Sequence, residues 1–230
     1  QFDFDSALEF SKALLAGSVL DRPREISLKA DIGRATFAGI EANDAHALIK
    51  MDGDGLLIDR LSIGDFAGGS FAASGRIETG GHAPRGTVSV DFEAKQTAAI
   101  AAIATKLSTE RSRPVLGLLE RFGRGKLRAK LDMKGDDKSP VTDAQLALNG
   151  DLDDLRIDAR VRASGDWARP STANIRVDAA LDAARSAQLL KFMNLDRMVA
   201  AGNGPGQLKI QLAGPVSGDM TFDSQLAGEG

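Results

Sequence analysis

Residue types that carry acid–base, nucleophilic or metal chemistry are sparse in this sequence. The chain has two histidines and no cysteine, which excludes thiolate nucleophiles and thiolate metal ligands. His46 lies among small residues in a weakly patterned strand, and His82 follows two glycines in an expected turn. Catalysis by histidine needs a partner group within hydrogen-bond reach, so we interpret both histidines as surface residues. The sequence predicts no catalytic residue, no metal site and no cofactor.

The stretch Met-Asp-Gly-Asp-Gly comes nearest to a calcium-binding loop. Asp52 and Asp54 fit the third and fifth ligand positions of such a loop, with Gly55 at the sixth. Lys50 then takes the first position and Leu61 the twelfth, and neither side chain is a calcium ligand. An Asp-Gly pair between apolar runs is typical of a tight hairpin turn, and we predict a β-hairpin here.

One aspartate cluster and one glycine-rich stretch remain as candidates for chemistry. Asp151, Asp153 and Asp154 fall where two strands must be joined, and aspartate is favoured in turns because its carboxylate bonds the nearby backbone. Residues 68–75 place serines among glycines but lack the G-x-S-x-G spacing of a nucleophile elbow. We interpret the aspartates as a turn, and the sequence as that of a protein that is not an enzyme.

The amino-acid composition argues against a nucleic-acid partner and against a membrane-spanning segment. The net charge of the 230 residues is −3, and the aromatic residues are ten Phe, one Trp and no Tyr. Nucleic-acid binding uses a basic stripe and stacking aromatics, so we expect no nucleic-acid partner. No stretch reaches the roughly 20 apolar residues of a membrane span. Because the chain begins at Gln1, we expect a fragment from which an upstream signal or anchor has been removed.

Most of the chain alternates apolar and polar residues, which is typical of strands with one apolar and one charged face. A tight turn is expected near Gly39, after the first of these strands. The expected strands are residues 25–32, 43–51, 55–63, 70–78, 87–93, 126–133, 144–150, 154–163, 173–179, 207–214 and 219–227.

Helical spacing appears only where a strand runs directly into an apolar stripe of period 3.6. Val90 lies 88 residues after Phe2, and Val177 lies 87 residues after Val90, and a recurring junction at near-constant spacing indicates a repeat. The expected helices are residues 5–20, 96–122 (with a break at Pro114) and 183–199. The chain is thus predicted to be a single repeat-built β-rich fragment, with units at about 1–94, 95–181 and, in part, 182–230.

The one-sided strands leave two architectures open. Two sheets that bury their apolar faces against each other form a sandwich, and this reading is favoured by the rarity of large exposed apolar patches. A single long, curved sheet would instead leave the apolar face as an open groove. The few helices, about one per repeat, are too few to cover such a face. From the pattern alone, we favour the sandwich.

Residues 26–78 resemble the repeating β segment of the AsmA-like proteins. The matching features are a strand, a short Gly-Ile link, a second strand, an Asp-Gly hairpin into Leu-x-Ile-Asp-x-Leu-Ser-Ile, and a strand that opens with Gly68-Gly69-Ser70 and leads to Ser-Gly-Arg-Ile. The junctions VDFEAKQ and VDAALDAAR resemble the place where that family puts a short helix. The family is related to TamB and to the bridge-like lipid-transfer proteins, and its members extend into the periplasm of Gram-negative bacteria from an inner-membrane anchor.

This resemblance implies a mainly β fold, in which repeated antiparallel β-sheet units curve into an elongated trough with short helices at the unit junctions. It implies a non-catalytic lipid-binding or lipid-transfer module for outer-membrane lipid homeostasis. Expected partners are phospholipid or another acyl lipid, the inner membrane through an anchor absent from this fragment, and other envelope proteins. The alternative is a scaffold or chaperone-like module that assists outer-membrane protein assembly, with a closed β-sandwich core.

The alternation also predicts which side chains face the groove and which face water. Lipid-groove candidates are Ile26, Leu28, Val88, Val90, Phe92, Leu127, Leu131, Leu155, Ile157 and Val161. Residues expected on the opposite, solvated face are Ser89, Asp91, Arg128, Lys130, Arg156 and Asp158.

Overall fold

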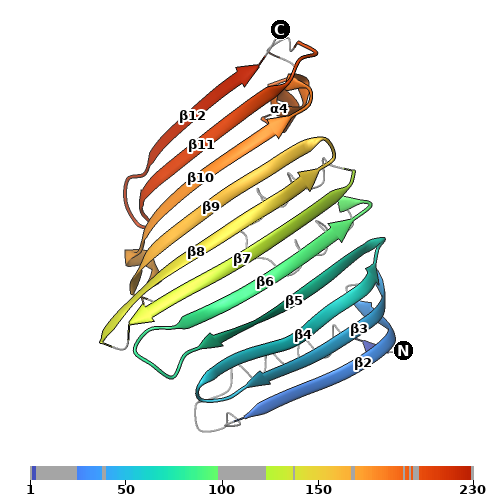
Figure 1. The fold of residues 1–230 in the computed structure, drawn as a ribbon, viewed down its shortest axis with the longest axis vertical. Helices are drawn as coiled ribbons and strands as arrows, with labels where there is room; N and C mark the ends of the chain where they lie inside the picture. Colours follow the sequence, from blue (N-terminus) through green and yellow to red (C-terminus); the bar gives the residue numbers. More distant parts are fainter. Residues whose placement is uncertain are drawn as a thin grey trace.

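The strands of this protein form one open sheet in chain order (Figure 1). The computed structural model describes residues 2–3, 25–37, 40–97, 123–136, 138–166, 169–193, 195–196, 198 and 202–228. A two-residue first strand pairs in parallel with the second, and each later strand pairs antiparallel with the strand before it. The sheet does not close into a barrel. The predicted mainly β fold is confirmed, and its shape is compatible with a curved trough.

The described residues contain twelve strands, one α-helix and one 3₁₀-helix. The strands are β1 (Phe2–Asp3), β2 (Ile26–Phe37), β3 (Ile40–Met51), β4 (Gly55–Phe66), β5 (Gly69–Glu78), β6 (Arg85–Ala94), β7 (Gly125–Asp136), β8 (Ser139–Leu152), β9 (Leu155–Asp166), β10 (Asn174–Ala183), β11 (Gly206–Pro215) and β12 (Thr221–Gly228). The helices are η3 (Pro170–Thr172), between β9 and β10, and α4 (Ser186–Phe192), between β10 and β11.

The predicted strands are all present, and most are longer than their patterns indicated. The sandwich is not the arrangement, because the strands lie in one sheet rather than in two facing sheets. The third predicted helix is shorter than expected: Ala183 still belongs to β10 and pairs with Gly206, and Arg185 has extended backbone. The 3₁₀-helix η3 was not predicted. The predicted helix 5–20 lies outside the described residues. The predicted helix 96–122 also lies outside them, except for residues 96–97.

Paired polar residues interrupt the alternation in the first strands, and β-bulges absorb them. In β4, Asp59 and Arg60 both stand between Ile58 and Leu61, and the register to β5 shifts between those two apolar residues. A bulge places two residues opposite one and so restores the alternation. In β3, Asp44 has a left-handed φ of 54° at the corresponding interruption. The apolar side chains before and after each interruption thus stay on one face.

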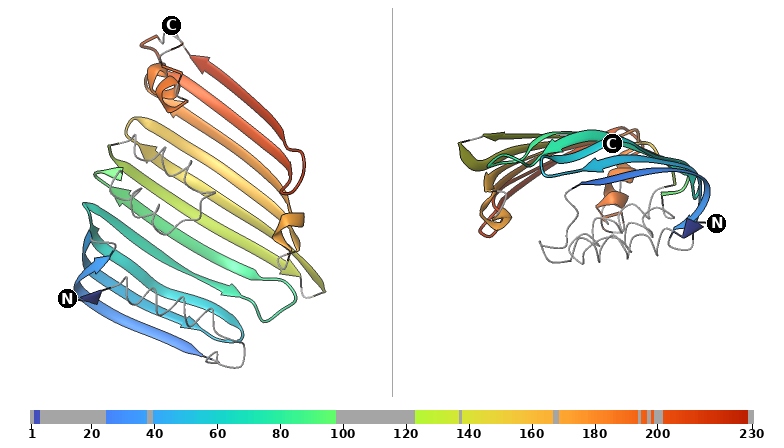
Figure 2. Two further views of the ribbon diagram at one scale, coloured as in Figure 1. Left: turned by 180° about the vertical axis from the view of Figure 1, so that it is seen from behind. Right: turned by 90° about the horizontal axis from the view of Figure 1, so that it is seen from below.

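Two glycines allow neighbouring strands to approach closely. Gly75 and Gly150 have φ values of 150° and 159°, a region that residues with a side chain rarely adopt. A Cβ at Gly75 would fall on the carbonyl oxygen of Thr87, and one at Gly150 on that of Lys126. Glycine kinks of this kind introduce curvature into a sheet. Figure 2 (right) shows that the sheet as a whole is arched.

The largest buried cluster lies at one end of the sheet, beneath α4. Leu189 of α4 is fully buried against Leu155, Leu181 and Leu208, which are adjacent on β9, β10 and β11. In Figure 2 (right), α4 lies on the inner side of the arch. The face that carries these leucines is therefore the concave face, and α4 covers one end of it.

We expect Leu155→Ala to lower the free energy of unfolding by about 2–5 kcal/mol, because it opens a cavity in this cluster. Leu226→Ala removes the same atoms from a side chain that is 48% exposed, and we expect a loss below about 1 kcal/mol there. Urea denaturation of both variants measures the difference. Equal losses would contradict the placement of the core beneath α4.

Candidate functional site

The candidate site is the concave face of the sheet, which is apolar across its whole width. The antiparallel registers place one residue of each strand from β2 to β12 directly opposite the next. Directly opposed residues share a face of the sheet, so the registers define a continuous row. In order, this row is Leu28, Ile49, Ile58, Gly75, Val88, Leu131, Leu146, Val161, Val177, Leu212 and Phe222.

A second apolar row runs parallel to the first, nearer to α4. It consists of Phe71, Phe92, Leu127, Gly150, Ile157, Leu181, Leu208 and Leu226. No charged side chain interrupts either row. We call the face of the sheet that carries both rows the apolar face.

The ten predicted groove residues all lie on the apolar face. Most are half-buried. Leu28 is 49% exposed, whereas Leu155 is almost fully buried beneath α4 and takes part in the core. The residues that were predicted to face water lie on the opposite face, where Ser89 opposes Lys130 and Asp91 opposes Arg128.

Sequence reasoning missed several members of the apolar face, although the same alternation marks them. They are Ile49, Ile58, Phe71, Leu146, Val177, Leu212 and Phe222. Leu146 and Phe222 are among the exposed large apolar side chains, at 37% and 66%. Both would be accessible to a ligand.

The convex face is charged, and its charges are matched across strands. Arg128 Nε donates to Asp91 at 2.7 Å, and Lys126 Nζ lies 3.4 Å from Glu93. Opposite charges on directly opposed residues stabilise a sheet, whereas like charges destabilise it. This face therefore has a structural explanation that needs no ligand.

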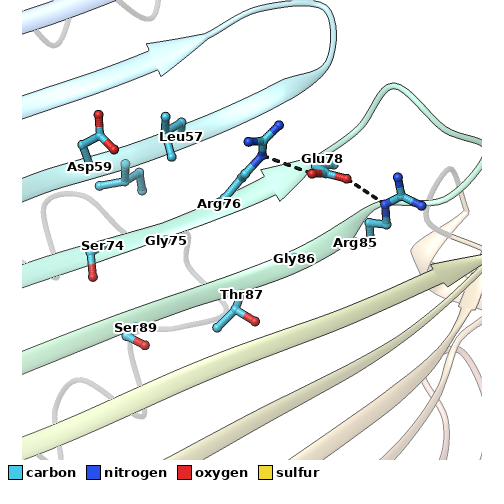
Figure 3. Close-up of a pocket in the computed structure, with 11 residues that line it drawn as sticks. Leu57, Asp59, Ser74, Gly75, Arg76, Glu78, Arg85, Gly86, Thr87 and Ser89 are labelled. Carbon is cyan, nitrogen blue, oxygen red and sulfur yellow. Dashed lines mark hydrogen bonds and ion pairs between the residues drawn. The ribbon is translucent and has the colours of Figure 1, made fainter.

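A shallow hollow of about 620 Å³ on this face contains a small ionic network (Figure 3). Glu78 lies between two arginines, 3.1 Å from Arg76 Nε and 2.7 Å from Arg85 Nε. The hydrogen bond from Arg85, with the charges of both arginines, lowers the pKa of the Glu78 carboxyl. Because the carboxylate is engaged by two cations, this network is suited to holding β5 and β6 together rather than to acid–base chemistry.

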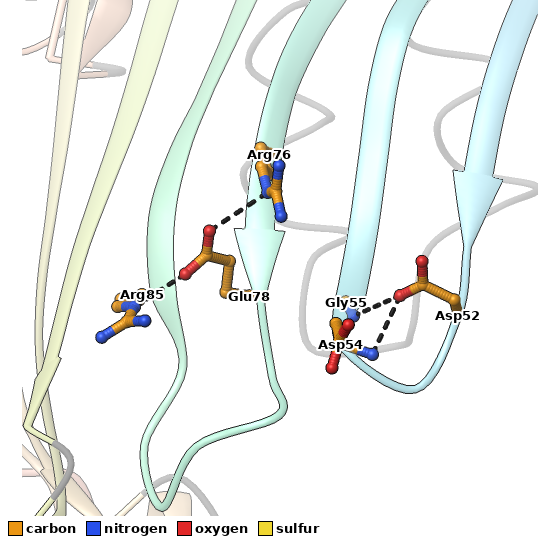
Figure 4. A network of polar contacts seen from close by, with 6 residues as sticks. All are labelled: Asp52, Asp54, Gly55, Arg76, Glu78 and Arg85. Carbon is orange, nitrogen blue, oxygen red and sulfur yellow. Dashed lines mark hydrogen bonds and ion pairs between the residues drawn. The ribbon is translucent and has the colours of Figure 1, made fainter.

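The predicted Asp-Gly hairpin lies beside this network (Figure 4). Asp52 Oδ1 accepts the backbone N–H groups of Asp54 and Gly55 at 2.9 and 3.0 Å. The predicted hairpin is present between β3 and β4, and the Asp52 carboxylate is used by its own turn. Among the described residues, no group of three or more acidic, histidine or cysteine side chains is arranged to hold a metal ion.

The two histidines are separate on the structure. His46 Nδ1 lies 2.7 Å from Asp31 Oδ1 on the neighbouring strand, and this hydrogen bond lowers the pKa of the Asp31 carboxyl. His82 is exposed in the loop between β5 and β6. On its other side, His46 has Ser62 of β4 as its direct register partner, so Asp31, His46 and Ser62 lie side by side on three adjacent strands.

Asp153 and Asp154 form the turn between β8 and β9, as predicted, whereas Asp151 belongs to β8 and is the register partner of Arg156. Asp153, at φ 52°, accepts the backbone N–H groups of Gly123 and Arg124 at 2.8 and 2.9 Å. Asp154 accepts a hydrogen bond from Gln188 of α4 at 3.0 Å. The turn thus ties the segment before β7 and the start of α4 to the same end of the sheet.

Comparisons of the chain with protein-family models, curated proteins and solved structures found no match. Within the described ranges, no helix has the length and hydropathy that crossing a membrane would require.

We expect the Glu78 network to stabilise the fold at neutral pH. The pKa of Glu78 is lowered in the fold, so its contribution is present above the ordinary glutamate pKa and is lost as the pH falls through the lower, folded value. Glu78→Gln should therefore be less stable than the unsubstituted chain at about pH 7 and equally stable near pH 2 to 3. Thermal denaturation at both pH values measures this. A stability difference that persists unchanged in acid would argue against the ionic origin.

Proposed function

We propose that this chain is a non-catalytic lipid-binding or lipid-transfer module, which holds acyl chains along the apolar face of its sheet. We further propose that it belongs to an AsmA-like envelope protein, with the periplasm as its location and an inner-membrane anchor in the full-length parent. The observation that carries the proposal is the uninterrupted apolar row from Leu28 to Phe222, which crosses eleven strands of an open sheet.

The size of the apolar face suits an acyl chain. Ten steps between the eleven strands β2 to β12, at about 4.8 Å each, give a width of roughly 48 Å. One leaflet of a bilayer has a hydrocarbon thickness of about 15 Å, half of the hydrocarbon core. The apolar face is therefore wide enough for several acyl chains in succession, and a chain could move along it without meeting a charge.

The energetics need no catalytic group. Each methylene that leaves water contributes about 0.8 kcal/mol, so even partial burial of one chain against the apolar face gives useful affinity. A charge in the row would have to be desolvated whenever a chain lay over it. The charged residues are kept on the convex face, which leaves the concave face without that cost.

The scaffold alternative depended on a closed sandwich core, and the described strands lie in a single open sheet. No specific observation favours it over lipid binding, and envelope proteins remain as further partners in the proposal. Outer-membrane lipid homeostasis would be the process served.

Leu146 and Ala147 offer a matched test, because they are sequence neighbours on opposite faces of β8. Leu146 lies between Leu131 and Val161 on the apolar face, and Ala147 lies between Lys130 and Arg160 on the charged face. We expect Leu146→Asp to weaken binding of a fluorescent phospholipid roughly tenfold or more, because the carboxylate must be desolvated. Ala147→Asp should bind as the unsubstituted chain does.

Circular dichroism and thermal melting report whether both variants fold. The neutral variant Leu146→Gln keeps the test decisive if the charge itself unfolds the chain, since it also places a polar group in the row. Equal phospholipid binding by the variants of the two positions, or no binding by the unsubstituted chain, would contradict the proposal.

A further inference from the structure

The charge matching on the convex face is broken at one place, where two arginines oppose each other. Arg162 of β9 and Arg176 of β10 are direct register partners. In the registers of the described strands, every other directly opposed pair of charged residues combines opposite signs. Because directly opposed like charges destabilise a sheet, this pair is unfavourable for folding.

One carboxylate, that of Asp178, lies close to both arginines. Asp178 Oδ2 lies 3.3 Å from Arg176 Nε and 3.9 Å from Arg162 Nη1. The residue directly opposite Asp178 is a third arginine, Arg160. One negative charge thus stands among three positive ones. Each guanidinium has five N–H donors, so most of the donors of this cluster are left for another acceptor.

The arginine pair lines a hollow of about 790 Å³ on the convex face. Ser164 and Asn174, which oppose each other one step along the same two strands, add neutral donors to its wall. The side chains of Arg162 and Arg176 are 54% and 60% exposed. Their guanidinium groups are therefore accessible from solvent.

Two further carboxylates line the hollow, and each has a lysine as a neighbour on the same strand or the next one. Asp132 lies 3.2 Å from Lys130 Nζ and accepts a hydrogen bond from Thr87. Asp143 is the register partner of Lys134. The positive charge of the arginine cluster is therefore not cancelled by these neighbours.

We propose that Arg162 and Arg176 form a binding site for a phosphate group. Paired guanidinium groups present parallel N–H donors that match the oxygens of phosphate. An unfavourable pair kept where local rules favour opposite charges is the pattern expected of a functional site. This site lies on the face opposite to the apolar face and is independent of the proposed lipid binding. The phosphate comes either from a lipid headgroup at a membrane surface or from a soluble phosphate.

The test uses the whole chain and two variants that remove one positive charge each. Arg176→Gln removes half of the pair. Arg156→Gln is the matched control, because Arg156 lies on the same face of β9 but is flanked by Asp151 and Asp182 as register partners. Inorganic phosphate is titrated at constant ionic strength, and binding is followed by NMR of the backbone amides of β9 and β10.

We expect saturable phosphate binding by the unsubstituted chain and by Arg156→Gln, weakened roughly tenfold in Arg176→Gln. Arg176→Gln should also denature no earlier than the unsubstituted chain without phosphate, since it relieves a like-charge contact. A structural role for Arg176 would instead lower its denaturation midpoint and leave phosphate binding unchanged, which would overturn the proposal.

Vesicle flotation separates the two sources of phosphate. Binding to phosphatidylglycerol vesicles that requires Arg176, with none to phosphatidylcholine vesicles, supports a lipid headgroup at an anionic surface. Binding of inorganic phosphate without binding to vesicles supports a soluble phosphate. Absence of both, or the same loss in Arg156→Gln as in Arg176→Gln, would overturn the proposal.

Discussion

The structure depends on one constraint, the strict two-residue alternation of side chains between the faces of a strand. In a sheet of antiparallel neighbours, a slip of one residue moves a whole strand's apolar set to the charged face. The two-residue interruptions in the first strands would each cause such a slip. A bulge at Asp59 and Arg60 removes it in β4, and the left-handed backbone of Asp44 lies at the interruption in β3. The continuous apolar row is therefore maintained strand by strand, because the correct pairing of each strand fixes which residues of the next strand face the same side.

The two faces of the sheet differ in the kind of contact that they offer. Charged groups on the convex face are largely occupied by one another, as Glu78 is by Arg76 and Arg85. Apolar groups on the concave face have no reactive atoms at all. An apolar surface of this kind binds a partner through its area and shape. The opposed arginines of β9 and β10 differ from the other directly opposed charged residues, which combine opposite signs.

Stability in such a sheet is distributed along its length. Each strand contacts mainly its neighbours in sequence, so the sheet behaves much like a repeat array, in which nearest-neighbour terms add up. The exception is the end beneath α4, where Leu155, Leu189 and Leu208 are almost fully buried. The turn at Asp153 and Asp154 joins this core to the segment that precedes β7. That end is the most firmly packed part described.

The sequence by itself determined the strands and their faces, because alternation is a local property that each segment carries alone. It also determined the Asp-Gly hairpin, where the Asp52 carboxylate bonds the backbone of its own turn. It located the turn at Asp153, but the bonds of this carboxylate to Gly123 and Arg124 are long-range contacts that only the assembled sheet provides. It did not determine the length of α4, which is limited by the pairing of Ala183 with Gly206 on another strand.

Only the tertiary structure decided between a sandwich and a single open sheet. Both architectures use the same one-sided strands, and the choice rests on which strands pair. The sequence could not predict the burial of Leu155 under α4 or the register pairing of Arg162 with Arg176 for the same reason. Contacts across strands depend on register, and register is a property of the assembled sheet rather than of any one segment.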